Sequence, residues 1–445
     1  MDSTATARLR SSLTGTLVLP GDDAYDEARS VWNASIDRRP SVVVRCAGVD
    51  DVARALEFAQ THDLVVAVRG GGHSFAGKST CDGGLVIDLS PMKQVEIDVA
   101  NRIARAGGGC TLADFDAATT AFGLATTMGT APPTGIAGLT LGGGIGWLMS
   151  RHGLACDNLI GAEVVTADGR RVRVGGGEHD DLLWGLRGGG GNFGVVTTFE
   201  YRMHPLTTVL AGAITYPVTA ARDVFRNYRD VVRAAPDDLT TIVGVLPLAT
   251  GPAFGVGVCW SGDPAAGEKA LAPLRRFGAP VEDTVRVRPY AEMQAFLSPP
   301  PIRLSSYARS SFVGDLDDAA IDVMAAHASP EIPAICFFFL EHLHGAVTRV
   351  RPEDSAFVHR AEGHSFAALA AWFEPEGAEP ATGWVRDFFG AMQPHFRSGV
   401  YSNYLADEGE ARVRAAYGSA YDGLVALKRR WDPSNVFRLN QNVAP

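Results

Sequence analysis

Two glycine-rich stretches in the first half of the chain could hold an anionic ligand. Residues 69–74 read RGGGHS, and residues 134–146 read TGIAGLTLGGGIG. Successive glycines leave backbone N–H groups free to converge on one point, which suits a pyrophosphate, and Arg69 adds positive charge. His73 closes the first stretch, where it has either a chemical role or that of an ordinary loop residue. The second stretch is equally compatible with close backbone packing.

A third glycine run, residues 188–194, contains the pattern GxGxxG. In a nicotinamide-dinucleotide fold this pattern follows a strand and opens a helix, so that the helix N-terminus meets the pyrophosphate. Here a helical pattern at residues 181–187 precedes the glycines, and a strand pattern at residues 195–201 follows them. No acidic residue lies about 20 positions further on to hold a ribose. This order argues against a nicotinamide-dependent dehydrogenase, which stays an alternative.

The elements around these loops must position them. A β-branched run, an amphipathic segment and a second apolar run predict a βαβ unit over residues 42–68. Residues 112–122 predict a helix with Thr111 as its N-cap. Residues 162–174 predict a hairpin around an Asp-Gly turn. Apolar positions at helical spacing predict a further helix over residues 410–430.

The length of the chain indicates two lobes. With 445 residues it exceeds the size at which one hydrophobic core stops growing, and its 46% hydrophobic and 20% charged residues are typical of a globular protein. The glycine runs stop near Leu206. We therefore expect residues 1–205 to form one lobe and residues 206–414 a second, with residues 415–445 returning to the first.

Charge and cysteine usage narrow the possible partners. The formal net charge of −10 would repel nucleic acid and anionic lipid, and the apolar run at residues 335–340 is far shorter than the roughly 20 residues that span a bilayer. The first residues are polar where a signal peptide needs an apolar segment, which predicts a cytoplasmic protein. The six cysteines occur singly, without zinc-ligand spacing, so neither disulfides nor a metal site are expected.

Seven short segments spread over nearly the whole chain carry a resemblance to a known family. They read VRGGGHS (68–74), VIDLS (86–90), TGIAGLTLGGGIGWL (134–148), GLACDNL (153–159), RGGGGNFGVVT (187–197), YSNY (401–404) and DPSNVFRLNQN (432–442). Together they resemble the FAD-linked oxidases of the berberine bridge enzyme type, a branch of the vanillyl-alcohol oxidase/p-cresol methylhydroxylase flavoproteins. The resemblance implies an α+β fold with an FAD-binding lobe and a substrate lobe in which helices cover a β-sheet.

The resemblance also implies how FAD is held. His73 matches the histidine that family members bond to the 8-methyl carbon of the flavin. Some members make a second link through a cysteine in a GxC stretch, but Ala131 stands at that position here, which indicates the singly linked branch. Cys156 is interpreted as a small buried residue. The other residues expected to bind FAD are Arg69, Gly70, Gly71, Gly72, Ser74, Thr134, Gly135, Gly138, Leu139, Gly142, Gly143, Gly144, Gly194, Val195, Val196, Asn440 and Gln441.

Tyr401 and Tyr404 of the YSNY segment are the expected catalytic residues, because the family places a tyrosine of this motif near the reactive face of the flavin. In a strand the two side chains would point to opposite faces, so only one could be the base. A tyrosine with a pKa near the ordinary value of about 10 needs a partner that lowers it. Burial with a satisfied hydroxyl is the alternative for either tyrosine, and a solvated polar face is the alternative for two of the candidate partners, His342 and His344. The candidate partners are Arg309, His342, His344 and His359.

These residues predict an oxidation of a small organic substrate, either a secondary metabolite or a sugar. A hydride would leave a C–H next to a hydroxyl for the flavin, a tyrosinate would take the hydroxyl proton, and dioxygen would reoxidise the flavin to give hydrogen peroxide. Oxidation of a C–N bond, favoured by an anionic or aromatic pocket, is one alternative. A dehydrogenase that uses another electron acceptor and a non-catalytic protein that binds small molecules are the others.

Overall fold

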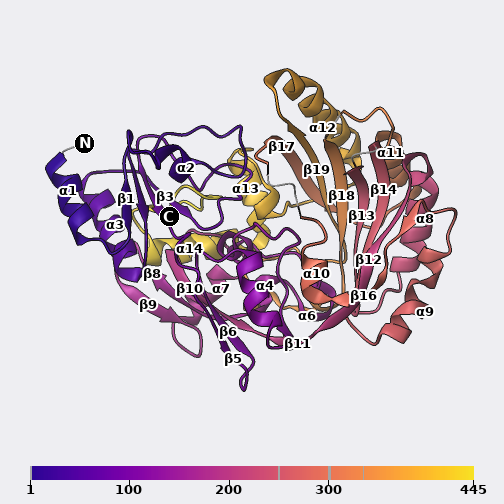
Figure 1. The fold of residues 1–445 in the computed structure, drawn as a ribbon, viewed down its shortest axis with the longest axis horizontal. Helices are drawn as coiled ribbons and strands as arrows, with labels where there is room; N and C mark the ends of the chain where they lie inside the picture. Colours follow the sequence, from indigo (N-terminus) through magenta and orange to yellow (C-terminus); the bar gives the residue numbers. More distant parts are fainter. Residues whose placement is uncertain (1–2, 249–250, 299–301, 334) are drawn as a thin grey trace.

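The computed structural model describes residues 3–248, 251–298, 302–333 and 335–445, and its elements form two groups (Figure 1). Strands between residues 16 and 205 form sheets of four, five and two strands among the described residues. Strands between residues 208 and 397 form one sheet of nine. The yellow C-terminal segment returns to the first group in Figure 1.

The four-stranded sheet carries the first glycine loop at the end of a strand. Its order is β1 (Thr16–Val18), β2 (Val42–Arg45), β4 (Leu85–Asp88) and β3 (Val66–Arg69). The predicted βαβ unit is confirmed, with α3 (Val49–Thr61) as the crossover. Strands β2 and β3 do not pair with each other, because β4 lies between them and is parallel to both.

The five-stranded sheet is antiparallel and carries the third glycine run. Its order is β5 (Val95–Asp98), β6 (Ile103–Gly107), β10 (Val195–Arg202), β8 (Leu159–Val165) and β9 (Arg171–Val174). The hairpin predicted over residues 162–174 is confirmed, since β8 and β9 pair around its turn. The run of glycines lies between α7 (Asp180–Leu186) and β10, so the expected order of helix, glycines and strand is confirmed.

Two helix predictions had different outcomes. Helix α4 (Leu112–Thr120) begins at Thr111, whose side chain accepts a hydrogen bond from the backbone of Asp114 in a capping box, as expected. The single helix predicted over residues 410–430 is wrong. It is divided into α13 (Glu410–Tyr417) and α14 (Tyr421–Trp431), because Gly418 has a φ of 49° and ends the first helix.

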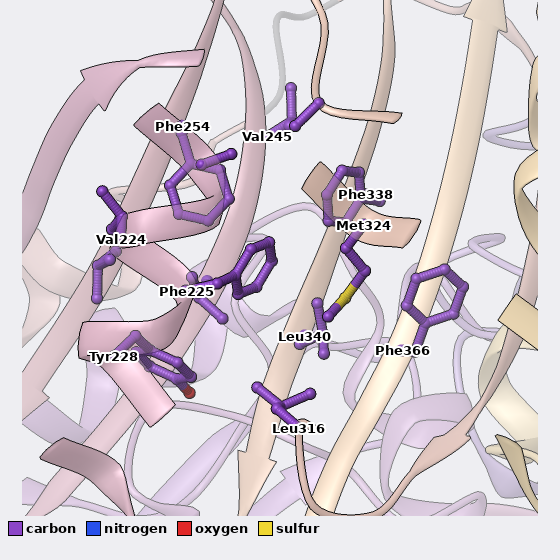
Figure 2. Close-up of a cluster of buried hydrophobic side chains, with 14 of the residues drawn as sticks. Val224, Phe225, Tyr228, Val245, Phe254, Leu316, Met324, Phe338, Leu340 and Phe366 are labelled. Atoms are coloured by element: carbon purple, nitrogen blue, oxygen red, sulfur yellow. The ribbon is translucent and has the colours of Figure 1, made fainter. Parts of the chain in front are cut away.

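The nine-stranded sheet is covered by helices on one face. Its long strands are β12 (Thr208–Pro217), β14 (Gly251–Trp260), β13 (Leu239–Leu248), β18 (Cys336–Leu343), β19 (Gly363–Trp372) and β17 (Ser305–Val313), with short strands β15 (Glu282–Asp283), β16 (Arg286–Pro289) and β20 (Phe396–Arg397) at its edges. The covering helices are α8 (Ala221–Val232), α9 (Pro264–Arg275), α11 (Asp318–His327) and α12 (Ala378–Met392). Figure 2 shows Phe225 of α8 and Met324 of α11 against Phe338 and Leu340 of β18.

Strand β18 presents different chemistry to its two faces. Side chains alternate along a strand, so Phe338 and Leu340 face the helices. Phe337 and Phe339 face the other way and pack with Phe75 of the first group. Glu341 has the same parity as this second pair. The uncovered face of the sheet is thus turned toward the glycine loops.

The remaining elements are short. They are α1 (Ser3–Ser12), α2 (Tyr25–Arg29), β7 (Leu124–Ala125), α5 (Ile136–Leu141), α6 (Met149–His152), β11 (His204–Pro205) and α10 (Tyr290–Gln294). No helix in the described part of the chain is long and apolar enough to cross a membrane.

A buried carboxyl group lies where α4 meets α10. Asp116 is 5% exposed and accepts one hydrogen bond from Gln294, at 2.9 Å, while burial raises its pKa to about 7. The unfolded chain ionises this group near its ordinary value, so folding stability is lost as the pH rises from about 4 to about 7. We expect Asp116→Asn to raise the free energy of unfolding by roughly 1–4 kcal/mol at pH 8.

Urea denaturation across this pH range measures the effect. The gain should grow between pH 4 and pH 7 and level off above. Asp387→Asn on the exposed side of α12 is the matched control and should change little. A gain that does not depend on pH would contradict the assignment to Asp116.

Candidate active site

The first two glycine stretches contact each other through their backbones. A Cβ added to Gly71 would lie 2.3 Å from the backbone nitrogen of Gly135, and one added to Gly135 would lie 2.3 Å from that of Gly71. Gly72 has a φ of +70°, which favours glycine. At Gly71 and Gly135 no side chain fits between the two loops. Both predicted stretches therefore form one backbone-lined surface.

His73 projects from this surface beside an indole ring. Trp32 stacks on its imidazole, with ring centroids 5.1 Å apart and planes inclined by 23°. The next residue, Asn33, exchanges two hydrogen bonds with the backbone of Ser306 on β17, which fixes Trp32 in place. Burial lowers the pKa of His73 to about 4. The imidazole is neutral at physiological pH and keeps a free electron pair.

The C-terminal tail is bonded to the third glycine run. The amide of Asn440 donates to the carbonyl of Gly191 at 3.0 Å, and Asn192 donates to the carbonyl of Gln441 at 3.2 Å. The side chain of Gln441 donates to the carbonyl of Leu405 at 2.9 Å. Residues from the middle and from the end of the chain thus meet at one place, although they are more than 200 positions apart.

A fully buried ion pair holds this junction. Lys428 on α14 is 0% exposed and donates three hydrogen bonds, to Asp432 and to the carbonyls of Asn192 and Phe437, at 2.7, 2.7 and 2.9 Å. Asp432 also accepts from the backbone N–H groups of Val436 and Phe437. Burial lowers the pKa of Lys428, whereas Asp432 opposes that shift. All donors of the ammonium group are satisfied, so it acts as a structural link.

Residues 142–144 pack against the YSNY segment. The hydroxyl of Tyr401 accepts hydrogen bonds from the backbone N–H of Gly144 and from the amide of Asn403, both at 2.8 Å. A Cβ on Gly142 would lie 2.1 Å from the Asn403 side chain. The amide of Asn403 also donates to the carbonyl of Leu139 at 2.9 Å. Tyr401 and Asn403 thus hold the second glycine loop in shape.

Tyr404 contacts a carboxyl group that the sequence analysis missed. Its hydroxyl donates to Oε1 of Glu341 at 2.9 Å. Glu341 is 1% exposed, and its other carboxyl oxygen has no hydrogen-bond partner among the described residues. Burial raises the pKa of Glu341 to about 7. The phenol and the carboxyl group together form a proton-transfer pair that can change state near neutral pH.

Two expectations about the tyrosines are wrong. Tyr401 and Tyr404 do not lie in a strand with opposed side chains, because residues 402–404 form a 3₁₀ turn that brings the rings to 4.9 Å, edge to face. Their pKa values are not lowered either. Burial raises the pKa of both hydroxyls, and the nearby Glu341 raises that of Tyr404 further. Burial therefore favours the neutral phenol at both positions.

The candidate partners of the tyrosines are engaged elsewhere. Arg309 donates to the hydroxyl of Tyr307 at 2.8 Å and pairs with Glu408. His359 bonds the carbonyl of Ala416 at 2.9 Å. The alternative of a solvated polar face for His342 and His344 is wrong, since the two rings are buried and stacked 4.3 Å apart.

A signal for Glu341 was present in the sequence. It follows Phe337 and Phe339 at a spacing of two in a strand that is apolar up to that point, which places it on their face of the sheet. An acidic residue in such a run is costly to bury and therefore often functional.

The other predicted FAD-binding residues lie around the glycine surface. Arg69 ends β3 and donates to the carbonyl of Ala28 at 2.6 Å, and Ser74 accepts from the backbone of Lys78 at 3.2 Å. A Cβ on Gly138 would meet no atom within 4 Å, so the chain leaves open space there. The rest are placed in known elements: Gly70 beside Gly108, Thr134 before α5, Gly143 against Phe357, Gly194 against Val164, and Val195 and Val196 at the start of β10.

Unpaired polar atoms around this surface fit a polar cofactor. Nε of Arg69, Oδ1 of Asn440 and Oδ1 of Asn442 are buried without a hydrogen-bond partner among the described residues. Buried polar atoms are rarely left unpaired, so each is available to a ligand. The glycine loops add free backbone and open space, as at Gly138. The residues present therefore fit FAD.

The chain is similar to known flavoproteins over nearly its whole length. Residues 40–175 match the family model described as FAD binding domain, and residues 400–444 match that described as berberine and berberine like. (R)-6-hydroxynicotine oxidase of Paenarthrobacter nicotinovorans is 31% identical over 98% of this chain and 97% of its own. An FAD-linked oxidoreductase of Dictyostelium discoideum is 30% identical over 98% of this chain and 95% of its own.

Solved structures agree with these relatives. The crystal structure of 6-hydroxy-D-nicotine oxidase from Arthrobacter nicotinovorans matches with a TM-score of 0.90 and 31% identity, over 98% of both chains. A carbohydrate oxidase of Microdochium nivale, 24% identical, shares the fold with a TM-score of 0.88 over 99% of both chains. The resemblance inferred from the sequence is confirmed, and with it the α+β fold and the binding of FAD. The chain belongs to the berberine-bridge-enzyme-like FAD-linked oxidoreductases of the vanillyl-alcohol oxidase/p-cresol methylhydroxylase family.

Proposed function

We propose that this FAD-dependent oxidase holds its cofactor covalently on His73 and transfers a substrate proton to the pair formed by Tyr404 and Glu341. The hydrogen bond of 2.9 Å between this phenol and this buried carboxyl group carries the proposal. It links the phenol to a carboxyl group whose pKa of about 7 lets it accept a proton near neutral pH. When bound, FAD would accept a hydride from a substrate carbon next to a hydroxyl or amine and pass the electrons to dioxygen, which yields hydrogen peroxide.

The cofactor is proposed to lie along the glycine surface. Residues 69–74 and 134–144, the start of β10 at residues 194–196, and Asn440 and Gln441 would contact it, as the sequence analysis expected. Residues 1–205 with 415–445 would then form the FAD-binding lobe, and residues 206–414 the substrate lobe. Ala131 offers no sulfur, so a single link is proposed.

The environment of His73 supports its role as the attachment point. An imidazole must be neutral to form a bond to carbon, and burial keeps the pKa of His73 at about 4. The stacked Trp32 holds the ring in one orientation. Residues 70–72 leave the approach to the imidazole free of side chains.

The proton would move through Tyr404 rather than to a free tyrosinate. The substrate hydroxyl or ammonium group would donate to the phenol oxygen while the phenol donates its own proton to Glu341. The phenol is thus never required to ionise on its own, in agreement with its raised pKa. Glu341 must begin as the carboxylate, since only that form accepts the proton.

Replacing His73 by alanine tests directly whether this residue carries the covalent link. After acid precipitation, the wild-type pellet should stay yellow, whereas His73→Ala should release FAD to the supernatant or carry none. His62→Ala, at an exposed histidine, is the matched control and should keep its colour in the pellet. FAD still bonded to denatured His73→Ala would refute His73 as the attachment point.

The ionisation of Glu341 should be visible in the infrared spectrum of the free enzyme and in the pH dependence of turnover. Its pKa is raised, so the neutral form persists up to about pH 7 and the carboxylate prevails above. We expect the infrared band of a protonated carboxyl group to disappear as the pH rises through about 7, and kcat/KM to fall by about tenfold per pH unit below it.

Asp116 titrates in the same range, so the measurement belongs in the Asp116→Asn background. Adding Glu341→Gln should remove the remaining band and flatten the profile. A band that persists in this double variant would assign the ionisation to another group.

A further inference from the structure

The face of the nine-stranded sheet that carries Glu341 is apolar and aromatic. Phe337, Phe339 and Tyr404 pack there with the buried side chains of Ala308, Ala367 and Leu369. The rings of Phe75 and Phe339 stand edge to face against that of Tyr404, with centroids 6.0 and 5.9 Å away. A substrate that reaches the hydroxyl of Tyr404 therefore meets ring faces and methyl groups.

Few polar groups interrupt this wall. Ser365 lies opposite Glu341 in the strand register, and Ser310 lies opposite Ala367. Both hydroxyls are buried, and that of Ser365 lies beside the carboxyl group of Glu341. A carbohydrate presents a hydroxyl on nearly every carbon, and each one left unpaired on burial costs free energy. The hydroxyls of Ser310, Ser365 and Tyr404 and one carboxyl group are too few to pair with every hydroxyl of a sugar ring.

The carboxyl group of Glu341 has no positive partner in the described part of the chain. It is buried beside the neutral side chains of Tyr404 and Ser365. Arg309 lies on β17, beyond β19, and pairs with Glu408. Buried carboxylates are normally paired with a cation or protonated. A cationic ligand that donates to Tyr404 would supply the missing charge, and the aromatic ring faces would attract it as well.

We infer that the substrate is a small aromatic amine, bound as the ammonium ion against Tyr404 and Glu341, and that the bond oxidised is C–N. This inference rests on the proposed function and selects oxidation of a C–N bond over oxidation of an alcohol.

The reaction balances with the groups named. The ammonium proton passes through Tyr404 to Glu341, which leaves the neutral amine. A hydride then leaves the adjacent carbon with two electrons for the flavin, and the nitrogen electron pair closes a C=N bond. Loss of the N–H proton gives the imine. Dioxygen takes up two electrons and two protons, so the sum is amine plus dioxygen to imine plus hydrogen peroxide.

Binding of a cation that cannot react separates recognition from turnover. Benzyltrimethylammonium is aromatic and cationic but has neither an N–H to donate nor a nitrogen electron pair, so it tests recognition of the charge alone. Its binding should perturb the flavin absorbance of the yellow holoenzyme, with a Kd at least tenfold lower than that of benzyl alcohol. Cellobiose should leave the absorbance unchanged. Glu341→Gln should weaken binding of the cation at least tenfold and leave that of benzyl alcohol unchanged.

Two further variants complete the design. Glu353→Gln, at a side chain that is 73% exposed, is the matched control and should bind the cation like the wild type. Phe339→Ala should weaken binding of the cation and of benzyl alcohol together, because the ring contributes to both. These readings use only holoenzyme whose FAD content equals that of the wild type.

Turnover then tests the substrate class. Peroxide release from N-methylbenzylamine should exceed that from benzyl alcohol and cellobiose at least a hundredfold in kcat/KM. Cation binding that is insensitive to Glu341→Gln, or a preference for cellobiose, would overturn the inference while an active oxidase remained. Cation binding that depends on Glu341, with no oxygen consumed by any amine or alcohol, would support recognition of an aromatic ammonium ion but refute both the C–N oxidation and the oxidase.

Discussion

Tyr404→Phe should lower kcat by about 10²- to 10⁴-fold, the range expected when a positioned proton-transfer group is removed. The phenylalanine ring would keep the contacts with Phe75 and Phe339, so the protein should retain its fold and its FAD. Only the bridge between the substrate and Glu341 is lost. The measurement is the rate of flavin reduction by N-methylbenzylamine, under nitrogen, in a stopped-flow spectrometer.

Tyr401→Phe is the matched control, because it removes a hydroxyl from the same turn. That hydroxyl accepts from the backbone of Gly144 and from Asn403, so its loss should cost about 1–3 kcal/mol of stability. Its effect on flavin reduction should be far smaller than that of Tyr404→Phe. Equal losses of rate in the two variants would show that Tyr404 has no special part in proton transfer.

Lys428→Met should destabilise the protein by about 3–5 kcal/mol, because it leaves the fully buried Asp432 without its cation. It also removes the donors that satisfy the carbonyls of Asn192 and Phe437. Urea denaturation followed by far-ultraviolet circular dichroism gives the loss. The same variant should bind FAD less completely, because the tail that it anchors contacts the third glycine run.

Two comparisons make this prediction sharper. Lys269→Met, at an exposed lysine of α9, should change the free energy of unfolding little. Adding Asp432→Asn to Lys428→Met should restore part of the lost stability, since no buried charge is then unpaired. A loss below 1 kcal/mol in Lys428→Met would contradict a structural role for this pair.

Local features of the fold could be predicted from the sequence because their causes are local. The capping box of α4 needs only Thr111 and Asp114, three positions apart. Close backbone packing was an alternative for the stretch that holds Gly135, although nothing in the spacing showed that Gly71 would be its neighbour. Gly418 ends a helix in the structure, but the apolar spacing on both sides of it is continuous and concealed the break.

The proton-transfer pair could not be predicted in the same way. Tyr404 and Glu341 are brought together by the pairing of β18 with β19 and by the turn at residues 402–404, which depend on tertiary packing. The histidines that follow Glu341 were candidate partners of the tyrosines because a solvated histidine titrates near neutral pH. Burial on the helix-covered face removes that property, since it lowers the pKa of His342 to about 2.

The bonding of the tail to the third glycine run sets a schedule for the maturation of the enzyme. A ribosome releases the loop that carries His73 early, but Asn440 and Gln441 emerge more than 360 residues later. Their hydrogen bonds with Gly191 and Asn192 cannot form before the tail has been synthesised. With FAD placed against these residues as proposed, its capture would follow the release of the tail.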